Sequence, residues 1–405
     1  MPSNLVQLAE SILKNAKVLE AYFDEHNLPR PSFEPDGPAD FGITQDHLHV
    51  EKARVDVIEA TQELSDLLQG PTHFLRPLTA GVSLSAISRW DIVSKVPLDG
   101  SATFAQLASQ CRIQESDMKR LLRYAMAHNR LFLEPQPGVV THSLVSRQLA
   151  SNSLLKEGFW LLAEQYFAAQ PHVTTALERW GDQPAEPNHC AFNVAFDTDK
   201  PAYEFMSSTP EGRELGRRFA LAMTSFARFP SRPASRGRLA RLPEAYDWAA
   251  LGHTRVVDVG GSRGADAIYL AKLYPGLEFV VQDLPGMIEG AEVPPELEGR
   301  VTFMPYSFFT PQPVTADVYV IKQCFHNWPD HYCVRILQNQ VPALKKGTTL
   351  VVIDSVVPPP GTMSLIDERN VRYVLQSSSR IVTSEERERE RLAKLTRDIV
   401  GHLTS

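Results

Sequence analysis

The sequence predicts an α/β protein in which a helical N-terminal part precedes a doubly wound, Rossmann-like parallel sheet. Three observations support this prediction. From residue 254 onward, apolar strand-like runs alternate with helix-like segments. A glycine-rich turn at residues 260–264 directly follows one such run, and Asp283 ends the next. Alternation of this kind gives parallel strands with right-handed crossovers, and nucleoside ligands bind at the carboxyl ends of such strands.

Length and composition limit the classes of function. The chain has 405 residues, of which 43 % are apolar, so two or three domains with sizeable cores are expected. Its formal net charge of −7 gives no attraction to nucleic acid or an anionic membrane. The four cysteines lack the spacing of a metal site, and no apolar run approaches the ~20 residues of a membrane span. We therefore expect a cytoplasmic protein with reduced thiols, without metal, nucleic acid or membrane as partners.

The N-terminal part begins with two predicted helices, residues 4–24 and 47–70, whose apolar residues recur at helical spacing. A loop rich in Pro, Gly and Asp joins them. Leading helices of this sort either exchange between two subunits or cap their own domain, and the sequence leaves both interpretations open.

Residues 71–150 show a winged-helix pattern. A helix at 103–108, a turn and a helix at 116–126 precede a two-strand wing around residues 135–138. The second helix carries Lys119, Arg120 and Arg123, which would suit DNA recognition. Because the chain is acidic overall, we expect a dimerisation scaffold instead.

Residues 151–250 are predicted to be helical and are rich in aromatic side chains. Such a layer, lying just before a nucleotide fold, suits an apolar substrate pocket. The side chains expected to line the pocket are Trp160, Phe192, Phe196, Met223 and Phe226. We thus divide the chain into residues 1–150 (dimerisation), 151–250 (linker and substrate pocket) and 251–405 (cofactor domain).

The C-terminal part alternates strands and helices. The predicted strands are 255–259, 277–282, 301–304, 316–321 and 348–354. The predicted helices are 265–274, 285–291 and 331–345. Gly260, Gly261 and Gly264 have the spacing G-G-x-x-G, which differs from the dinucleotide pattern G-x-G-x-x-G and favours S-adenosylmethionine (SAM) over NAD.

Motifs spread over nearly the whole chain carry a family resemblance. They are Thr141-His142-Ser143, Ala191-Phe192-Asn193, Asp258-Val259-Gly260-Gly261, Val281-Gln282-Asp283-Leu284-Pro285, Phe308-Phe309-Thr310-Pro311 and His326-Asn327-Trp328-Pro329-Asp330. The sequence resembles the SAM-dependent O-methyltransferases of the caffeate and flavonoid type, especially their fungal members. The resemblance implies a homodimer with interlocked N-terminal regions and a small-molecule substrate.

The resemblance also implies cofactor-binding residues. They are Asp258, Gly260, Gly261, Asp283, Met304, Ser307, Phe308 and Lys322. Gly260 and Gly261 would lie against the methionine and ribose portions of SAM, and Asp283 would accept the ribose hydroxyls. Met304 and the segment up to Phe308 would flank the adenine. Family members often have Asp where Ser307 stands.

The resemblance assigns the chemistry to His326, which would act as general base towards a phenol. Asp354 matches the position of an acid that orients this ring. Two further acidic positions that accompany this histidine in the family are not acidic here, because Asn327 replaces an Asp and Ile381 replaces a second orienting Glu. An alternative is that His326 only caps the helix that begins near Pro329. Only 22 residues follow Thr383, so either the sheet lacks the antiparallel hairpin that closes it in the family or this sequence is incomplete.

Three functions follow from these residues. The first is methyl transfer to a hydroxyl of an aromatic or polyketide-derived metabolite, with His326 as base. The second is a SAM-binding pericyclase or dehydratase, as in some fungal relatives, where Lys322 and His142 would polarise a substrate carbonyl. The third is a role without catalysis, as a DNA-binding regulator or a pseudoenzyme partner.

Overall fold

A computed structural model describes residues 5–71, 81–229, 242–354, 362–363 and 368–369. The described chain forms two compact units, and the division between them falls after Glu164. It lies inside a π-helical turn, Leu161–Tyr166, and therefore within the segment that the sequence predicts to be a linker. No helix in the described ranges is long and apolar enough to cross a membrane.

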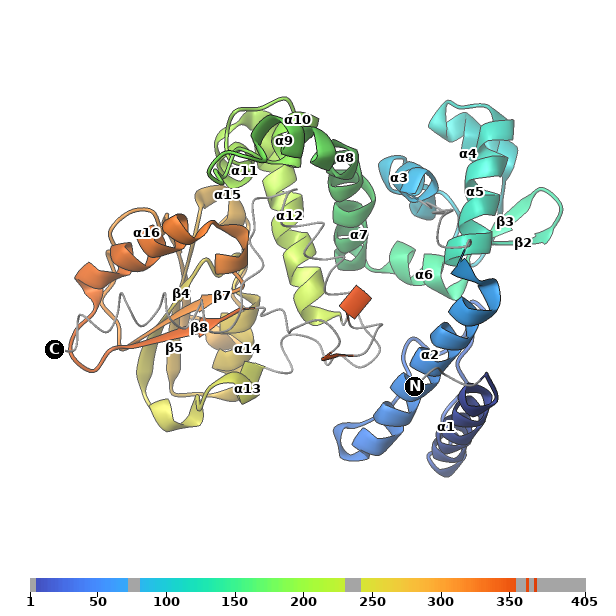
Figure 1. Cartoon of the computed structure of the whole chain (residues 1–405), viewed down its shortest axis with the longest axis horizontal. Coiled ribbons are helices and arrows are strands. Elements are labelled where there is room, and N and C mark those ends of the chain that lie inside the picture. Colours follow the sequence, from blue (N-terminus) through green and yellow to red (C-terminus); the bar gives the residue numbers. More distant parts are fainter. Residues whose placement is uncertain (1–4, 72–80, 230–241, 355–361, 364–367, 370–405) are drawn as a thin grey trace. The chain divides into compact units, whose positions relative to one another are not determined.

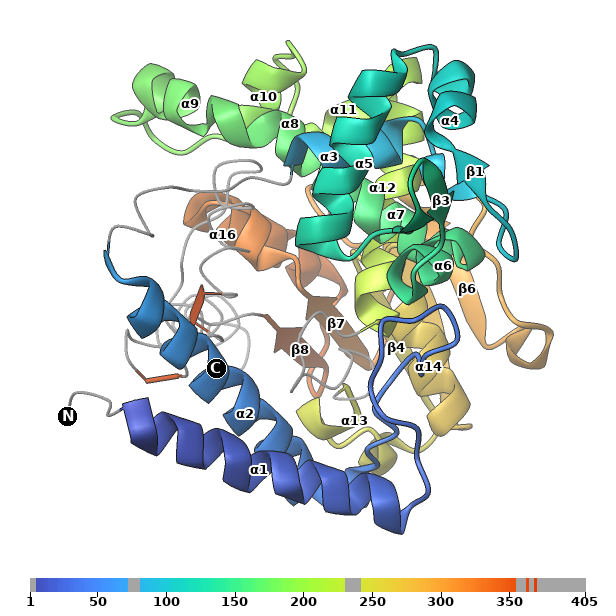
Figure 2. The same ribbon diagram turned by 90° about the vertical axis from the view of Figure 1, so that its right-hand side faces the viewer.

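The first unit begins with a helical hairpin. Helices α1 (Leu5–Glu25) and α2 (Leu48–Gln69) lie side by side, as Figure 2 shows. Tyr22, Phe23 and Val50 form the small core between them. Several large apolar side chains on these helices are exposed, namely Leu5, Val6, Leu13, Leu48, Leu67 and Leu68. The exchange of this hairpin between subunits stays a prediction.

Within the described residues, the rest of the first unit contains five α-helices and a small sheet, and its assignment as a winged helix stays a prediction. Its helices are α3 (Gly81–Arg89), α4 (Phe104–Cys111), α5 (Glu115–Asn129), α6 (Leu144–Ser151) and α7 (Ser153–Trp160). Strands β1 (Ala102–Thr103), β2 (Leu133–Gln136) and β3 (Val139–Thr141) form an antiparallel sheet in the order β1-β3-β2. Capping boxes at Thr103 and Ser143 start α4 and α6, because each side chain accepts an otherwise unpaired backbone N–H.

The second unit opens with short helices. They are α8 (Phe167–Ala169), α9 (Val173–Trp180), α10 (Ala191–Ala195), α11 (Ala202–Ser208) and the longer α12 (Pro210–Arg228). Pro210 at the first turn of α12 and the Thr209 side chain, which accepts the Gly212 N–H, fix where that helix begins. Helices α11 and α12 pack on α15 (Pro285–Ile288), which directly follows the second strand of the sheet.

The predicted parallel sheet is confirmed. Its strands are β4 (Thr254–Val259), β5 (Leu277–Asp283), β6 (Val301–Pro305), β7 (Val318–Lys322) and β8 (Thr349–Ile353). They are all parallel and lie in the order β6-β5-β4-β7-β8. The chain runs outward from β4 to β6 and then resumes on the other side of β4. Ligands of open α/β sheets bind outside the carboxyl ends at such a reversal.

Helices cover both faces of this sheet (Figure 1). Helix α14 (Ala265–Leu273) and α13 (Leu242–Ala245) pack on the face that holds Val256, Val318 and Val320. Helix α16 (Asp330–Gln340) packs on the face with Tyr319 and Ile321. Strand β7 therefore buries side chains on both faces, which explains its continuous apolar sequence.

The observed elements correct a few predicted bounds. Helix α15 ends at Ile288 because Glu289 has a non-helical ψ of 127° and Gly290 has a φ of +64°. Helix α16 ends at Gln340, and a 3-10 turn containing Pro342 follows, since proline cannot donate the next helical hydrogen bond. The predictions for Arg380 to Thr383, including Ile381, and for the C-terminal sheet lie outside the described residues.

Candidate cofactor and active site

A glycine turn follows β4 at the carboxyl edge of the sheet. Gly260 has a φ of +77°, and a Cβ on it would lie 2.7 Å from the Cys324 sulfur. A Cβ on Gly261 would overlap the Asp258 carboxylate. The backbone N–H groups of both glycines donate to the Gln282 carbonyl, at 2.7 and 3.1 Å. Only glycine fits both positions, so the turn leaves bare backbone at the strand ends for a ligand to approach.

Asp283 ends β5 beside this turn. Its carboxylate accepts the backbone N–H of Ser262 at 2.8 Å and that of Leu284 at 2.7 Å. Burial raises the pKa of Asp283 to about 6, although these two hydrogen bonds act in the opposite direction. A carboxylate has about four acceptor positions, so two are left for the hydroxyls of a ribose.

A buried charge cluster lies under the turn, on the α14 face. The Lys322 ammonium is 2.5 Å from Asp266 Oδ2, and both side chains are largely buried. Asp258 is 4 % exposed, and its Oδ2 has no hydrogen-bond partner within the described part of the chain. Burial, followed by the charge of Asp266, raises the pKa of Asp258 to about 7, while Lys322 opposes the rise. The Lys322 ammonium is therefore paired with a carboxylate of the same unit.

His326 lies at the same edge, in a 3-10 turn (Phe325–Asn327) after β7. Its Nδ1 is 2.6 Å from Asp354 Oδ1, and its backbone N–H donates to Asp354 Oδ2 at 3.1 Å. Asp354, the residue after β8, is 3 % exposed at the side chain, whereas His326 is 24 % exposed. The structure thus brings together the predicted base and its predicted orienting acid.

The backbone between β7 and His326 is constrained. Gln323 adopts the left-handed region with a φ of +55°, and its N–H donates to the Ile353 carbonyl at 2.8 Å. Cys324 packs on Gly260, and burial followed by the carboxylates of Asp283 and Asp354 raises its thiol pKa well above the usual range. Its thiol stays protonated, and several carboxylates converge on this point.

The segment predicted to flank the adenine follows β6. Met304 Sδ lies 3.6 Å from the Gln282 side-chain amide. The Phe308 ring is 3.6 Å from where a Gly260 Cβ would stand, and it meets the Trp328 ring edge-on. Ser307 folds the loop, because its carbonyl accepts both the N–H and the hydroxyl of Thr310. Of these three residues, Phe308 borders the glycine turn directly, whereas Met304 contacts Gln282 beside it.

Sequence reasoning missed two residues at this edge. Asp266 begins α14 next to the glycine turn, and only its pairing with Lys322 reveals it. Tyr203 of α11 packs on Trp328 and Phe219. Its phenol pKa is raised well above the usual value, first by burial and then by neighbours that include Cys324 and Asp283. Tyr203 is one of many aromatic residues in the predicted helical layer at 151–250, and no motif distinguishes it from the others.

The predicted pocket residues differ in their exposure. Phe192 is fully buried, stacks on Phe196 at 4.4 Å between ring centroids and meets Phe205 edge-on. It belongs to a core between α10 and α11. Met223 and Phe226 lie one turn apart on α12 and are half-buried, as is Phe196. Trp160 is buried at the end of α7, in the first unit.

His142 is a buried residue of the first unit. One ring nitrogen lies 3.0 Å from the Ser146 hydroxyl and the other 3.0 Å from the Val96 carbonyl. Burial lowers its pKa. Both ring nitrogens are thus engaged inside the unit, and a catalytic role of His142 stays a prediction.

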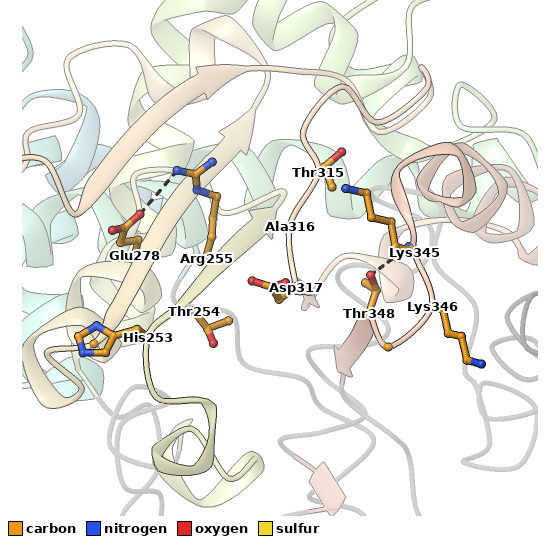
Figure 3. A pocket seen from close by; sticks show the side chains of 12 residues that line it. His253, Thr254, Arg255, Glu278, Thr315, Ala316, Asp317, Lys345, Lys346 and Thr348 are labelled. Carbon is orange, nitrogen blue, oxygen red and sulfur yellow. Dashed lines mark hydrogen bonds and ion pairs between the residues drawn. The ribbon is translucent and has the colours of Figure 1, made fainter.

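A cavity of about 480 Å³ lies at the opposite, amino edge of the sheet (Figure 3). Its lining is polar and carries both charges, and Arg255 pairs with Glu278 of the neighbouring strand at one side of it, at 3.7 Å. Lys345 and Lys346 stand at its other side. None of the predicted site residues lines this cavity, and parallel sheets bind ligands at the carboxyl edge. We therefore place the site at the carboxyl edge.

A glycine turn, an acid at the next strand tip and a carboxylate-held histidine at one sheet edge define a Rossmann-like enzyme that uses a nucleoside cofactor. Comparison with known proteins narrows the class. A family model described as an O-methyltransferase domain matches residues 239–397. The Grayanic acid biosynthesis cluster O-methyltransferase of Cladonia grayi is 39 % identical over 98 % of this chain and 83 % of its own length. The chain belongs to the O-methyltransferase family, whose cofactor is SAM.

Solved structures show the same fold. The complex of LepI with SAM has a TM-score of 0.66 at 21 % identity, covering 96 % of this chain and 93 % of LepI. A structure described as a pericyclic reaction enzyme has a TM-score of 0.65 at 23 % identity, covering 86 % of this chain and 88 % of its own. At these identities the likeness concerns the fold alone.

Proposed function

We propose that this protein is a SAM-dependent O-methyltransferase in which His326 removes the proton from a hydroxyl of an aromatic or polyketide-derived metabolite. The observation that carries the proposal is the His326–Asp354 pair at the edge that also bears the glycine turn and Asp283. The cofactor residues and the base then lie at the ends of neighbouring strands, as a transfer reaction requires.

Asp354 determines how His326 can act. A carboxylate at Nδ1 favours the tautomer with the proton on that nitrogen, so the lone pair of Nε2 faces outward. Nε2 then accepts the substrate proton, and the charge of Asp354 stabilises the imidazolium that forms. When bound, SAM supplies an electrophilic methyl group. The hydroxyl oxygen would form a bond to this methyl carbon as its proton passes to His326, while the carbon–sulfur bond breaks and neutral S-adenosylhomocysteine leaves.

The charges at the site suit a cationic cofactor. Asp258, Asp266, Asp283 and Asp354 bring four carboxylates to this edge, and Lys322 is the ammonium among them. The raised pKa values of Asp258 and Asp283 indicate that their charged forms lack compensation. A sulfonium and an ammonium would supply it. Bare backbone at Gly260 and Gly261 and free acceptor positions on Asp283 complete the fit.

The pericyclase alternative has less support. It requires Lys322 and His142 to donate to a substrate carbonyl. Lys322 is paired with Asp266 on the α14 face, and both ring nitrogens of His142 are engaged. The likeness to a pericyclic reaction enzyme concerns the fold, which both activities share.

The regulator alternative also has less support. On α5, Lys119 pairs with Glu115, Arg120 with Asp117, and Arg123 with Glu134. These cations are compensated by neighbouring acids, so the helix offers little net charge to phosphate groups.

The test is to incubate the protein with SAM and a panel of phenols and to measure S-adenosylhomocysteine. We expect release by the wild type and a loss of kcat of about 10²–10⁴-fold in His326→Gln. His331→Gln, on the exposed surface of α16, is the matched control and should keep full activity. If SAM binds but is never consumed while a carbonyl-containing intermediate turns over, methyl transfer is excluded.

A further inference from the structure

Three buried glutamines connect the parts of the cofactor site. Gln282 and Gln340 are fully buried and Gln312 is 5 % exposed. Glutamine is mostly an exposed residue, and burying its amide is costly unless every polar atom is paired. These three come from β5, from the loop after β6 and from the end of α16.

The three side chains form a continuous chain of amide hydrogen bonds. Gln282 and Gln312 donate to each other, both at 2.8 Å. Gln312 also donates to Gln340 Oε1 at 2.9 Å and accepts the Val314 N–H at 3.1 Å. All four hydrogen-bonding positions of the Gln312 amide are therefore used. Gln340 in turn donates to the Ile336 carbonyl and lies 3.4 Å from the Tyr306 hydroxyl.

At one end, these amide hydrogen bonds reach the glycine turn. The backbone carbonyl of Gln282 accepts the N–H groups of Gly260 and Gly261, and the next residue is Asp283. The Gln282 amide also lies against Met304 Sδ. Gln282 thus contacts the turn with its backbone and the loop after β6 with its side chain.

The same hydrogen bonds also include the loop of residues 306–312, which carries Ser307 and Phe308 and ends at Gln312. Its backbone is tied to α16, because Gln312 N–H donates to the Asn339 carbonyl at 2.8 Å and Asn339 Nδ2 donates to the Phe308 carbonyl at 3.3 Å. The Tyr306 hydroxyl closes the loop on the Thr310 carbonyl at 2.8 Å. The loop therefore depends on α16 and on Gln312 for its position.

We propose that Gln282, Gln312 and Gln340 are positioning residues that hold the 306–312 loop against the glycine turn and so set the affinity for the adenosine half of the cofactor. The proposal rests on the cofactor site proposed above. The three amides touch no reacting atom, and they carry no charge. Their loss should weaken binding of the adenosine moiety, leave the chemical step unchanged and have the same effect at every pH.

Gln312→Met tests this, because methionine keeps the volume of the side chain and removes all four amide hydrogen bonds. Calorimetry with the full-length protein should show the Kd for SAM raised roughly tenfold, while kcat at saturating SAM stays within twofold. The Kd for 5′-methylthioadenosine, which lacks the amino-acid part, should rise by the same factor. Gln338→Met, exposed on the same helix as Gln340, is the matched control and should leave both values unchanged.

Gln340→Met is the milder variant, and its Kd for SAM should fall between those of Gln338→Met and Gln312→Met. It keeps the proposal testable if Gln312→Met does not fold. A lower melting temperature with an unchanged SAM Kd in the folded protein would show a merely structural role and overturn the proposal. A Kd that rises for SAM but not for methylthioadenosine would also overturn it. Failure of the wild type to bind SAM would instead overturn the proposed function.

Discussion

His326 and Asp354 make two contacts, one through the imidazole and one through the backbone. Nδ1 lies 2.6 Å from one carboxylate oxygen, and the backbone N–H donates to the other at 3.1 Å. The carboxylate therefore fixes both the ring and the turn that carries it. Asp354 itself directly follows β8, whose register with β7 pairs Ile353 with Lys322. Two adjacent parallel strands thus set the distance between these residues.

Asp354→Asn should lower kcat for methyl transfer by about 10²–10³-fold with little change in the SAM Kd. The amide keeps the shape but removes the charge that stabilises the imidazolium, and its NH₂ group can favour the wrong tautomer. Release of S-adenosylhomocysteine under saturating SAM measures the effect. An Asp354→Asn enzyme that retains wild-type kcat would show that His326 does not act through this pair.

The affinity for SAM should depend on pH through Asp283. Its pKa is about 6, and the carboxylate must be ionised to accept two hydroxyls. Binding therefore weakens as the pH falls through about 6, by up to tenfold per pH unit. Calorimetry between pH 5 and 8 would reveal this step. Asp283→Asn should bind SAM more weakly at pH 8 and should lack the step; a step that persists in this variant would assign it to another group.

Asp258 should make the protein without ligand less stable as the pH rises. Its folded pKa of about 7 lies above the ordinary value of 3.8. Between these values the folded state binds more protons than the unfolded state, so the free energy of unfolding falls with rising pH and levels off above about 7. The groups facing Asp258 are Asp266, Lys322 and Asp283.

The matched variant for this effect is Asp258→Asn. Its melting temperature relative to the wild type should be several degrees higher at pH 8 than at pH 5, because the variant carries no proton to lose. Thermal unfolding of both proteins across that range measures the difference. Parallel curves for the two proteins would mean that Asp258 has an ordinary pKa.

The pair formed by Lys322 and Asp266 should show strong coupling in a double-mutant cycle. Lys322→Met leaves buried carboxylates without a counter-ion and should cost about 3–5 kcal/mol of unfolding free energy. Asp266→Leu should cost less, because Asp258 still compensates Lys322. The double variant should be more stable than the sum of the two losses indicates. Urea unfolding at pH 8 gives the four values, and additive losses would contradict the pairing.

The fold was readily predicted because its signals are local. Each strand of the sheet is an apolar run closed by a turn residue, and every predicted strand is present within two residues of its expected start. The glycine turn and Asp283 also stand next to each other in space because neighbouring parallel strands end at one edge. The proximity of residues that follow neighbouring strands can be predicted from the strand order alone.

The partners of site residues could not be predicted in this way. Lys322 is four residues before His326, yet Lys322 faces α14 while His326 contacts Asp354. Asp266, Tyr203 and Gln340 reach the site through helix packing, which depends on contacts far apart in the sequence. The same holds for His142, whose motif suggested chemistry while its two ring contacts are internal.

Strand β7 should not tolerate insertions or deletions, because its two faces carry different side chains. Ile321 and Lys322 point to opposite faces of the sheet, so an insertion or deletion of one residue in β7 would exchange an apolar core position with the ammonium that balances Asp266. The same shift would displace His326 by one residue and break its contact with Asp354. We therefore expect insertions and deletions to be tolerated only in the segments between strands. If Phe196, which follows α10, and Met223 and Phe226 of α12 line the substrate pocket as predicted, substitutions at these half-buried side chains should change the substrate without disturbing the sheet.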